Sequence, residues 1–319
     1  MSLSNFLKPA GKAKFVDRFT KKMNELLVSP DKHEGPVKYG LIGAPLSKPS
    51  ISHSGASMAP SAIREAMASY STYANHSDQD FRDISIVDFG DVLMHPTGIL
   101  ESQDRIYQSV KAVLGQHDIE NFILFGGDHS VSFPSIKALN EQKGTVGVIQ
   151  FDAHHDLRNL EDGGPTNGTP FRRSIENNVL KGEHIVQIGI RDFTNAKAYA
   201  DYAEEQGVQV YTMQDVQQRD IQSIIQESLD YLSEKVDLIY LSVDMDVLDQ
   251  AFAPGCPAIG PGGMDSQTLL TAVEKAADHP MVKGMDIVEI DPTLDIRNMT
   301  SRVASYVLFS YIKSKDLKK

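Results

Sequence analysis

The chain has 319 residues, and 43 acidic against 31 basic side chains give it a formal net charge of −12 at pH 7. Its content of 41% hydrophobic and 23% charged residues is typical of a folded globular protein and excludes a disordered or fibrous one. The acidic balance argues against nucleic acid as a partner, because phosphate binding needs clustered Lys and Arg.

Cysteine usage and hydropathy indicate a cytoplasmic protein. The single cysteine, Cys256, excludes an internal disulfide and a Cys-rich zinc module. The first thirty residues carry charged side chains throughout and never offer the apolar run of a signal peptide. Elsewhere no apolar run approaches the ~18 residues that a membrane span needs. We therefore expect a cytoplasmic location and no membrane partner.

In chain order, short β-branched apolar runs alternate with segments of helical period. The runs predict strands at Val37–Gly43, Ile84–Asp88, Phe122–Phe125, Val146–Phe151, Ile185–Gly189, Val208–Tyr211, Leu238–Val243 and Lys283–Glu289. The periodic segments predict helices at Ser61–Ser69, Ile99–Leu114, Val131–Glu141, Ala196–Gln206, Ile221–Ser233, Ser266–Ala277 and Thr300–Lys313. This alternation indicates an α/β fold with a mostly parallel sheet and helices on both faces. Residues 1–36 are expected to form a helical N-terminal extension, followed by one domain over residues 37–319.

Four of the predicted strands end in residues that can carry chemistry, and parallel strands place their carboxyl ends at one rim. The four groups are Gly126-Gly127-Asp128-His129-Ser130, Asp152-Ala153-His154-His155-Asp156, Ser242-Val243-Asp244-Met245-Asp246 and Asp286-Ile287-Val288-Glu289. Taken singly, an aspartate at a strand end is most often a turn former or a helix N-cap. Together, the groups gather four carboxylates and two imidazoles at one edge.

So much negative charge at one edge would repel itself unless cations neutralised it. Two divalent ions would balance the four charges of Asp152, Asp156, Asp244 and Asp246. The donors are carboxylate oxygens and imidazole nitrogens without thiolate, and this set favours Mn²⁺ over structural zinc. We therefore predict two Mn²⁺ per subunit, with a hydroxide that bridges them as the nucleophile.

The same four groups, in this order, resemble the signatures of the ureohydrolase superfamily, which includes arginases and agmatinases. The resemblance extends from about Gly40 to Arg302. It implies a three-layer α/β/α catalytic domain over residues 37–319, around a mostly parallel eight-stranded sheet. It also implies a dinuclear manganese site that hydrolyses an amidine or guanidine carbon–nitrogen bond. One metal would be held by His129, Asp152, Asp156 and Asp244, and the other by Asp152, His154, Asp244 and Asp246, with Asp152 and Asp244 bridging.

Within this superfamily, residues 163–172 and 253–258 resemble the branch that acts on N-formimino-L-glutamate. Arginases have a histidine where Asn167 stands, so the chain departs from the arginase pattern at this position. The resemblance implies hydrolysis of N-formimino-L-glutamate to L-glutamate and formamide, a step of histidine degradation.

This substrate carries charge at both of its ends. Its formimino group is a cation at neutral pH, which Glu289 would bind by charge-assisted hydrogen bonds. Asp246 is a candidate proton shuttle as well as a ligand. The candidate partners of the substrate's two carboxylates are Arg158, Arg172 and Arg173, beside Asn167, although each arginine could equally pair with a carboxylate of the protein itself.

Two alternatives stay open from the sequence. Another amidinohydrolase of the superfamily, such as an agmatinase or a guanidino-acid hydrolase, would release urea in place of formamide. A metal-binding scaffold without catalysis would show no turnover with Mn²⁺, although the intact ligand set and Glu289 argue against it. Members of the superfamily are commonly trimers or hexamers, so we expect a homo-oligomer that acts on a small molecule.

Overall fold

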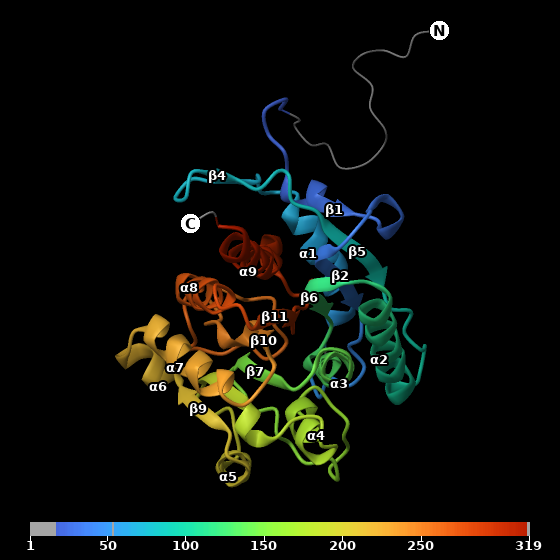
Figure 1. Cartoon of the computed structure of the whole chain (residues 1–319). Coiled ribbons are helices and arrows are strands. Elements are labelled where there is room, and N and C mark those ends of the chain that lie inside the picture. Colours follow the sequence, from blue (N-terminus) through green and yellow to red (C-terminus); the bar gives the residue numbers. More distant parts are fainter. Residues whose placement is uncertain (1–16, 53, 318–319) are drawn as a thin grey trace.

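The described part of the chain forms three layers, with one sheet between two layers of helices (Figure 1). The structure is a computed structural model and describes residues 17–52 and 54–317. Its central sheet has nine strands, all paired in parallel, in the order β1-β5-β2-β6-β11-β10-β7-β8-β9. The strands are β1 Leu27–Val28, β2 Val37–Ala44, β5 Ile86–Asp91, β6 Ile119–Gly126, β7 Val146–Phe151, β8 Ile185–Ile190, β9 Gln209–Thr212, β10 Leu238–Asp244 and β11 Val282–Val288. The predicted three-layer fold around a parallel sheet is confirmed.

The prediction was wrong at the amino-terminal edge of the sheet. Eight strands correspond to the predicted runs, and the two-residue strand β1 pairs with β5 as a ninth. Residues 1–16 of the predicted helical extension lie outside the described residues. Residues 17–36 form no α-helix but two 3-10 helices, η1 Met23–Leu26 and η2 Pro30–Lys32, on either side of β1. Pro30 lacks the amide donor that a continuing helix would need. The domain boundary after residue 36 stays a prediction.

Two layers of helices cover the sheet (Figure 1). One layer contains α1 Ala59–Met67, α6 Met213–Gln218, α7 Ile221–Ser233, α8 Ser266–Ala277 and α9 Met299–Asp316. The other contains α2 Ile99–Gln116, α3 Ser132–Lys143, α4 Pro170–Glu176 and α5 Lys197–Gln206. The short elements are the hairpin of β3 Tyr73–Ala74 with β4 Gln79–Asp80 and the 3-10 helices η3 Ala56–Met58, η4 His129–Val131, η5 Gly182–His184, η6 Met245–Val247 and η7 Ile296–Asn298. Within the described ranges, no helix is long and apolar enough to cross a membrane.

The central strands are mostly apolar because helices cover both faces of the sheet. Every residue of β7 and of β10 is buried. Side chains of β6 alternate between the two layers, so that Ile123 and Phe125 join one apolar cluster while Phe122 and Leu124 join the other. In sheet order, β6, β11, β10 and β7 are consecutive. Four rigid neighbouring strands therefore present their carboxyl ends at one rim.

Candidate metal centre

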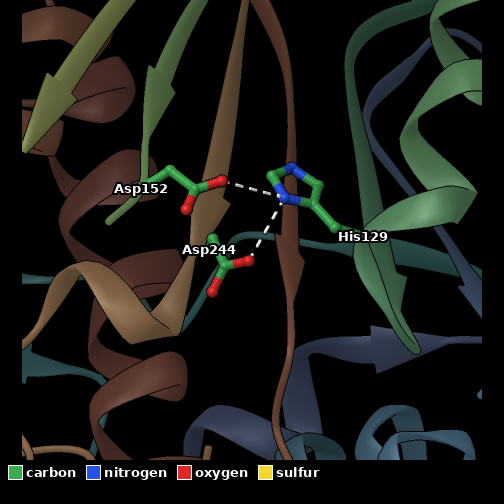
Figure 2. A group of neighbouring side chains, drawn as sticks. All are labelled: His129, Asp152 and Asp244. Atoms are coloured by element: carbon green, nitrogen blue, oxygen red, sulfur yellow. Dashed lines mark ion pairs between the residues drawn. The ribbon is translucent and has the colours of Figure 1, made fainter. Parts of the chain in front are cut away.

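The predicted site residues of three strand ends converge on one imidazole nitrogen. His129 Nδ1 lies 3.1 Å from Asp152 Oδ2, 2.9 Å from Asp156 Oδ2 and 3.2 Å from Asp244 Oδ2. Figure 2 shows His129, Asp152 and Asp244 pointing toward one another from three different segments. All four side chains are buried. The rim therefore holds a buried, carboxylate-rich cluster.

A second group of side chains lies beside the first and shares Asp152 with it. His154 Nδ1 is 2.9 Å from Asp246 Oδ2 and 3.5 Å from Asp152 Oδ1. Asp152 thus presents Oδ2 to His129 and Oδ1 to His154. The two groups that could hold an ion are His129 with Asp152 and Asp244, and Asp152 with His154 and Asp246. The His154 side chain is 26% exposed, so the second group is open to solvent.

The aspartates of the cluster also fix the loops that carry them. Asp152 Oδ1 accepts the His154 N–H at 2.6 Å, and Asp244 Oδ1 accepts the Asp246 N–H at 2.8 Å. Asp246 Oδ1 accepts the Ala153 N–H at 3.1 Å. The first two bonds are the side-chain turns that aspartates at strand ends commonly form, and the third joins the two loops to each other. Turn formation and ligand function are therefore compatible here, because the Oδ2 atoms remain directed at the cluster.

Two site residues have a left-handed backbone, which residues other than glycine rarely adopt. Asp156 has φ +51° and Glu289 has φ +60°. Strand β11 consequently ends at Val288, one residue before the predicted end, and Glu289 Oε1 accepts the backbone N–H of His129 at 2.8 Å. The loop before His129 needs glycine, since a Cβ at Gly127 would lie 1.8 Å from the carbonyl oxygen of Leu46.

The buried carboxylates of the cluster have few cations of the chain's own around them. Burial, followed by the charges of Asp246 and Asp152, raises the pKa of Asp244 well above its usual range. Burial and Asp152 raise the pKa of Asp156 to about 6. The Asp246 carboxylate raises the pKa of His154 to about 12. Burial and mutual repulsion thus disfavour the charged form of Asp244 and Asp156, and bound metal ions would supply the positive charge that stabilises it.

His129 Nδ1 gives the clearest indication of what the cluster fits. This atom is buried, and although three carboxylate oxygens lie within 3.2 Å of it, it completes a hydrogen bond with no described residue. A ring nitrogen directed at the centre of three carboxylates is arranged as a metal ligand. The donor set is mostly oxygen with imidazole and without thiolate, so it fits a hard divalent ion such as Mn²⁺.

Known proteins match this chain over nearly its whole length. Residues 37–313 match the arginase family. The chain belongs to the arginase family. The formimidoylglutamase of Halalkalibacterium halodurans is 56% identical over 308 residues, which cover 96% of each chain. The formimidoylglutamase of Bacillus subtilis is 48% identical over 314 residues, covering 98% of this chain and 97% of that one.

Structural comparison agrees with the arginase-family assignment. A crystal structure of the Bacillus subtilis formimidoylglutamase matches this chain with a TM-score of 0.94 at 47% identity, covering 98% of this chain and 97% of the other. The agmatinase of Bacillus subtilis is more distant, at 31% identity over 271 residues, covering 84% of this chain and 88% of that one. The resemblance to ureohydrolases seen in the sequence is confirmed.

The structure separates the three arginines that the sequence grouped together. Arg158 is exposed, and its guanidinium makes no ion pair with a described residue; its Cζ lies 5.7 Å from the ring centroid of Tyr199. The remaining two guanidinium groups are engaged on the helices. Arg172 pairs with Glu176 at 2.5 Å and stacks on Tyr202, whereas Arg173 donates to Gln103 at 2.7 Å and lies over Phe133. Of the three arginines, only Arg158 has a guanidinium group without a polar partner among the described residues.

Asn167 reaches the site through Glu289. Its Nδ2 donates to Glu289 Oε1 at 3.0 Å, and its Oδ1 accepts the Ile51 N–H at 3.1 Å. Oε1 of Glu289 therefore receives two donors from the chain, one from Asn167 and one from His129. Burial, followed by the charge of Asp128, raises the pKa of Glu289 to about 8.

Three buried polar residues to which the sequence reasoning gave no role of their own lie against the cluster. Gln150 Nε2 donates to Asp152 Oδ2 at 2.7 Å, Ser242 Oγ lies 2.9 Å from His129 Nε2, and Asp286 accepts from Ser242 at 2.8 Å. Each interrupts an otherwise apolar stretch of a buried strand. Since an uncompensated polar group in such a strand is costly, this interruption was the available signal.

Proposed function

We propose that this chain hydrolyses N-formimino-L-glutamate to L-glutamate and formamide with two bound Mn²⁺. The observation that carries the proposal is the 56% identity to a formimidoylglutamase over 96% of both chains. A cluster rich in buried carboxylates, beside Glu289 and an unpaired Arg158, supports a substrate that has a cationic head and an anionic tail.

Six residues, two of them shared, would hold the two metal ions. One ion would be held by His129, Asp152, Asp156 and Asp244, and the other by Asp152, His154, Asp244 and Asp246. The absence of thiolate among these donors favours Mn²⁺. When bound, the two ions supply Lewis acidity and lower the pKa of a water molecule, so that it can attack near neutral pH.

Glu289 would hold the formimino cation. Its Oε1 is occupied by the donors of His129 and Asn167, which leaves Oε2 to accept an N–H of the amidinium. Glu289 must be ionised for this contact. Burial raises its pKa, whereas the hydrogen bonds from His129 and Asn167 lower it, and an arriving cation lowers it further. Asn167 thus serves the substrate by orienting Glu289.

Asp246 would move the proton that the reaction releases. The Ala153 N–H fixes Asp246 Oδ1, while Oδ2 faces His154 at the open side of the cluster. The water oxygen bonds to the formimino carbon, and the bond from that carbon to the glutamate nitrogen breaks. Both protons of the water end on this nitrogen, the first of them through Asp246, so that glutamate leaves with its ammonium group and formamide keeps the other nitrogen.

Arg158 would bind the glutamate tail. It follows Asp156 by two residues, and its guanidinium group makes no ion pair with a carboxylate of the described residues. Arg172 and Arg173, also predicted as tail-binding residues, are engaged by Glu176 and by Gln103, which supports giving Arg158 the principal role. The homo-oligomeric state and the cytoplasmic location stay predictions.

The test is an assay of purified, Mn²⁺-loaded protein against formiminoglutamate, agmatine, arginine and guanidinobutyrate, with identification of the products. We expect turnover of formiminoglutamate with release of formamide. Faster hydrolysis of agmatine or guanidinobutyrate, with release of urea, would assign the chain to another amidinohydrolase activity. No turnover of any of the four substrates by metal-loaded protein would indicate a metal-binding scaffold.

A further inference from the structure

A buried chain of hydrogen bonds lies behind His129, on the opposite side of its ring from the carboxylate cluster. His129 Nε2 lies 2.9 Å from Ser242 Oγ, and Ser242 Oγ donates to Asp286 Oδ1 at 2.8 Å. Ser132 Oγ donates to the other oxygen, Asp286 Oδ2, at 2.6 Å. All four residues are buried. The pairing register of the sheet sets Ser242 of β10 opposite Asp286 of β11, so two rigid strands hold the chain in place.

The donor directions in this chain determine where His129 carries its proton. A serine hydroxyl has one hydrogen, and Ser242 gives it to Asp286. Toward His129 the same oxygen can therefore only accept, which requires a hydrogen on Nε2. Nδ1 is then the nitrogen that can give up its proton, and it is the one directed at Asp152, Asp156 and Asp244.

Two further observations support a positioning role for this chain. The His129 ring packs against Phe171, with ring centroids 5.4 Å apart and an interplanar angle of 85°, so the imidazole is held on a second side. Asp286 accepts a hydroxyl at each oxygen, as an ionised carboxylate does. Burial raises the pKa of Asp286, whereas His129 and the hydroxyls of Ser132 and Ser242 lower it.

The other histidine of the centre has no such support. His154 is partly exposed, and no described residue makes a hydrogen bond with its Nε2. The chain through Ser242 and Asp286 therefore acts on one metal position and leaves the other unaffected.

We propose that Ser242 and Asp286 are positioning residues that keep the proton of His129 on Nε2 and so set the affinity of the metal position at Nδ1. The inference rests on the metal centre of the proposed function and is independent of the substrate. Groups that orient a histidine ligand typically change metal affinity by about 10- to 100-fold when they are removed.

The test measures Mn²⁺ binding to Ser242→Ala and Asp286→Asn. Metal is counted by mass spectrometry after loading and dialysis, and the two stepwise dissociation constants are measured by titration. We expect one constant to rise by about 10- to 100-fold and the other to stay as in the wild type. The matched control is Ser228→Ala, a buried serine that donates to the Ile224 carbonyl oxygen on α7. Two unchanged constants in both Ser242→Ala and Asp286→Asn would overturn the inference.

A double-mutant cycle distinguishes positioning from a general loss of packing. In a His129→Asn background, Ser242→Ala should have no further effect on metal binding, because the ring that it orients is gone. A full additional loss in that background would overturn the inference, while the substrate assignment would stand. If Ser242→Ala does not fold, Asp286→Asn, which keeps the side-chain volume, completes the same cycle. A wild-type chain that binds no second ion would overturn the dinuclear centre and this inference with it.

Discussion

The central sheet buries polar side chains at both ends, but those around Asn121 at the amino end are hydrogen-bonded within the chain, whereas those around His129 at the carboxyl end are not. At the amino end, Tyr311 donates to Asn121 Oδ1 at 3.0 Å, Asn121 Nδ2 donates to the Lys38 carbonyl oxygen at 3.1 Å, and Tyr39 donates to Asp316. At the carboxyl end, His129 Nδ1 and Asp128 Oδ2 are buried and complete no hydrogen bond with a described residue.

This difference distinguishes buried polar groups that stabilise the fold from those that are available to bind a ligand. A closed network of buried hydrogen bonds stabilises and orders a fold, whereas unsatisfied groups destabilise it unless something else binds them. The open end also has the left-handed residues Asp156 and Glu289. Variants at the open end should therefore affect metal and turnover, and variants at the closed end should affect stability alone.

The largest effect is expected from Asp244→Ala at the open end. This substitution removes a carboxylate that contacts His129 and is proposed to serve both ions. We expect it to lower bound metal and to abolish turnover. The fold should be retained, because burial and the neighbouring carboxylates already disfavour a charge on Asp244 in the metal-free protein. Metal analysis and an activity assay check this outcome. Normal metal content with near-normal activity would refute the dinuclear centre.

Next in size is the effect of Glu289→Gln, which keeps the shape of the side chain and removes its charge. We expect kcat/KM to fall by several orders of magnitude while both metals stay bound, because Glu289 is proposed to hold the substrate cation rather than an ion. Steady-state kinetics and metal analysis are measured on the same preparation. Metal loss as large as in Asp244→Ala would place Glu289 among the ligands.

A smaller effect is expected from Arg158→Met, compared with Arg172→Met as its matched control. Arg158→Met should raise KM for formiminoglutamate by about tenfold or more and change kcat less, because the lost contact is made in ground and transition states alike. Arg172 is paired with Glu176, so its variant should leave KM near the wild-type value. Equal KM values for both variants and the wild type would show that Arg158 does not bind the carboxylates of the substrate.

The smallest effect tests the closed end. Tyr311→Phe leaves Asn121 Oδ1 without its donor and should lower the free energy of unfolding by about 1–3 kcal/mol. Metal content and kcat should remain unchanged, since this network does not reach the rim. Denaturant unfolding of the metal-free protein measures the first quantity. A parallel loss of metal would show that the two ends are coupled and would break the comparison.

Much of this arrangement could be predicted from the sequence because the central strands are mostly apolar runs. Strand β7 was predicted with its observed bounds, and the ligand groups follow such strands directly. The helices α4 and α6 were missed, since seven and six residues are too few to show a helical period. The strand β1 was also missed, because its two residues are too few to show an alternating pattern.

Side-chain partners from distant segments were beyond the reach of the sequence. Arg172 and Arg173 are adjacent in α4, but what engages them is Tyr202 of α5 and Gln103 of α2. The contact between Ser242 and Asp286 depends on the register of β10 against β11. Spacing along one strand does not determine such a register, which is set by the packing of both strands against the helices.

The position of β11 has a consequence for the order in which this protein matures. Of the described strands it is the last in chain order, yet it inserts between β6 and β10, and Glu289 directly after it bonds to His129 across 160 residues of chain. A ribosome-bound chain that ends before residue 282 has the aspartates of the candidate metal centre but lacks the strand that separates β6 from β10. Such a nascent chain cannot assemble this rim, so the proposed metal site can form only after β11 has been synthesised.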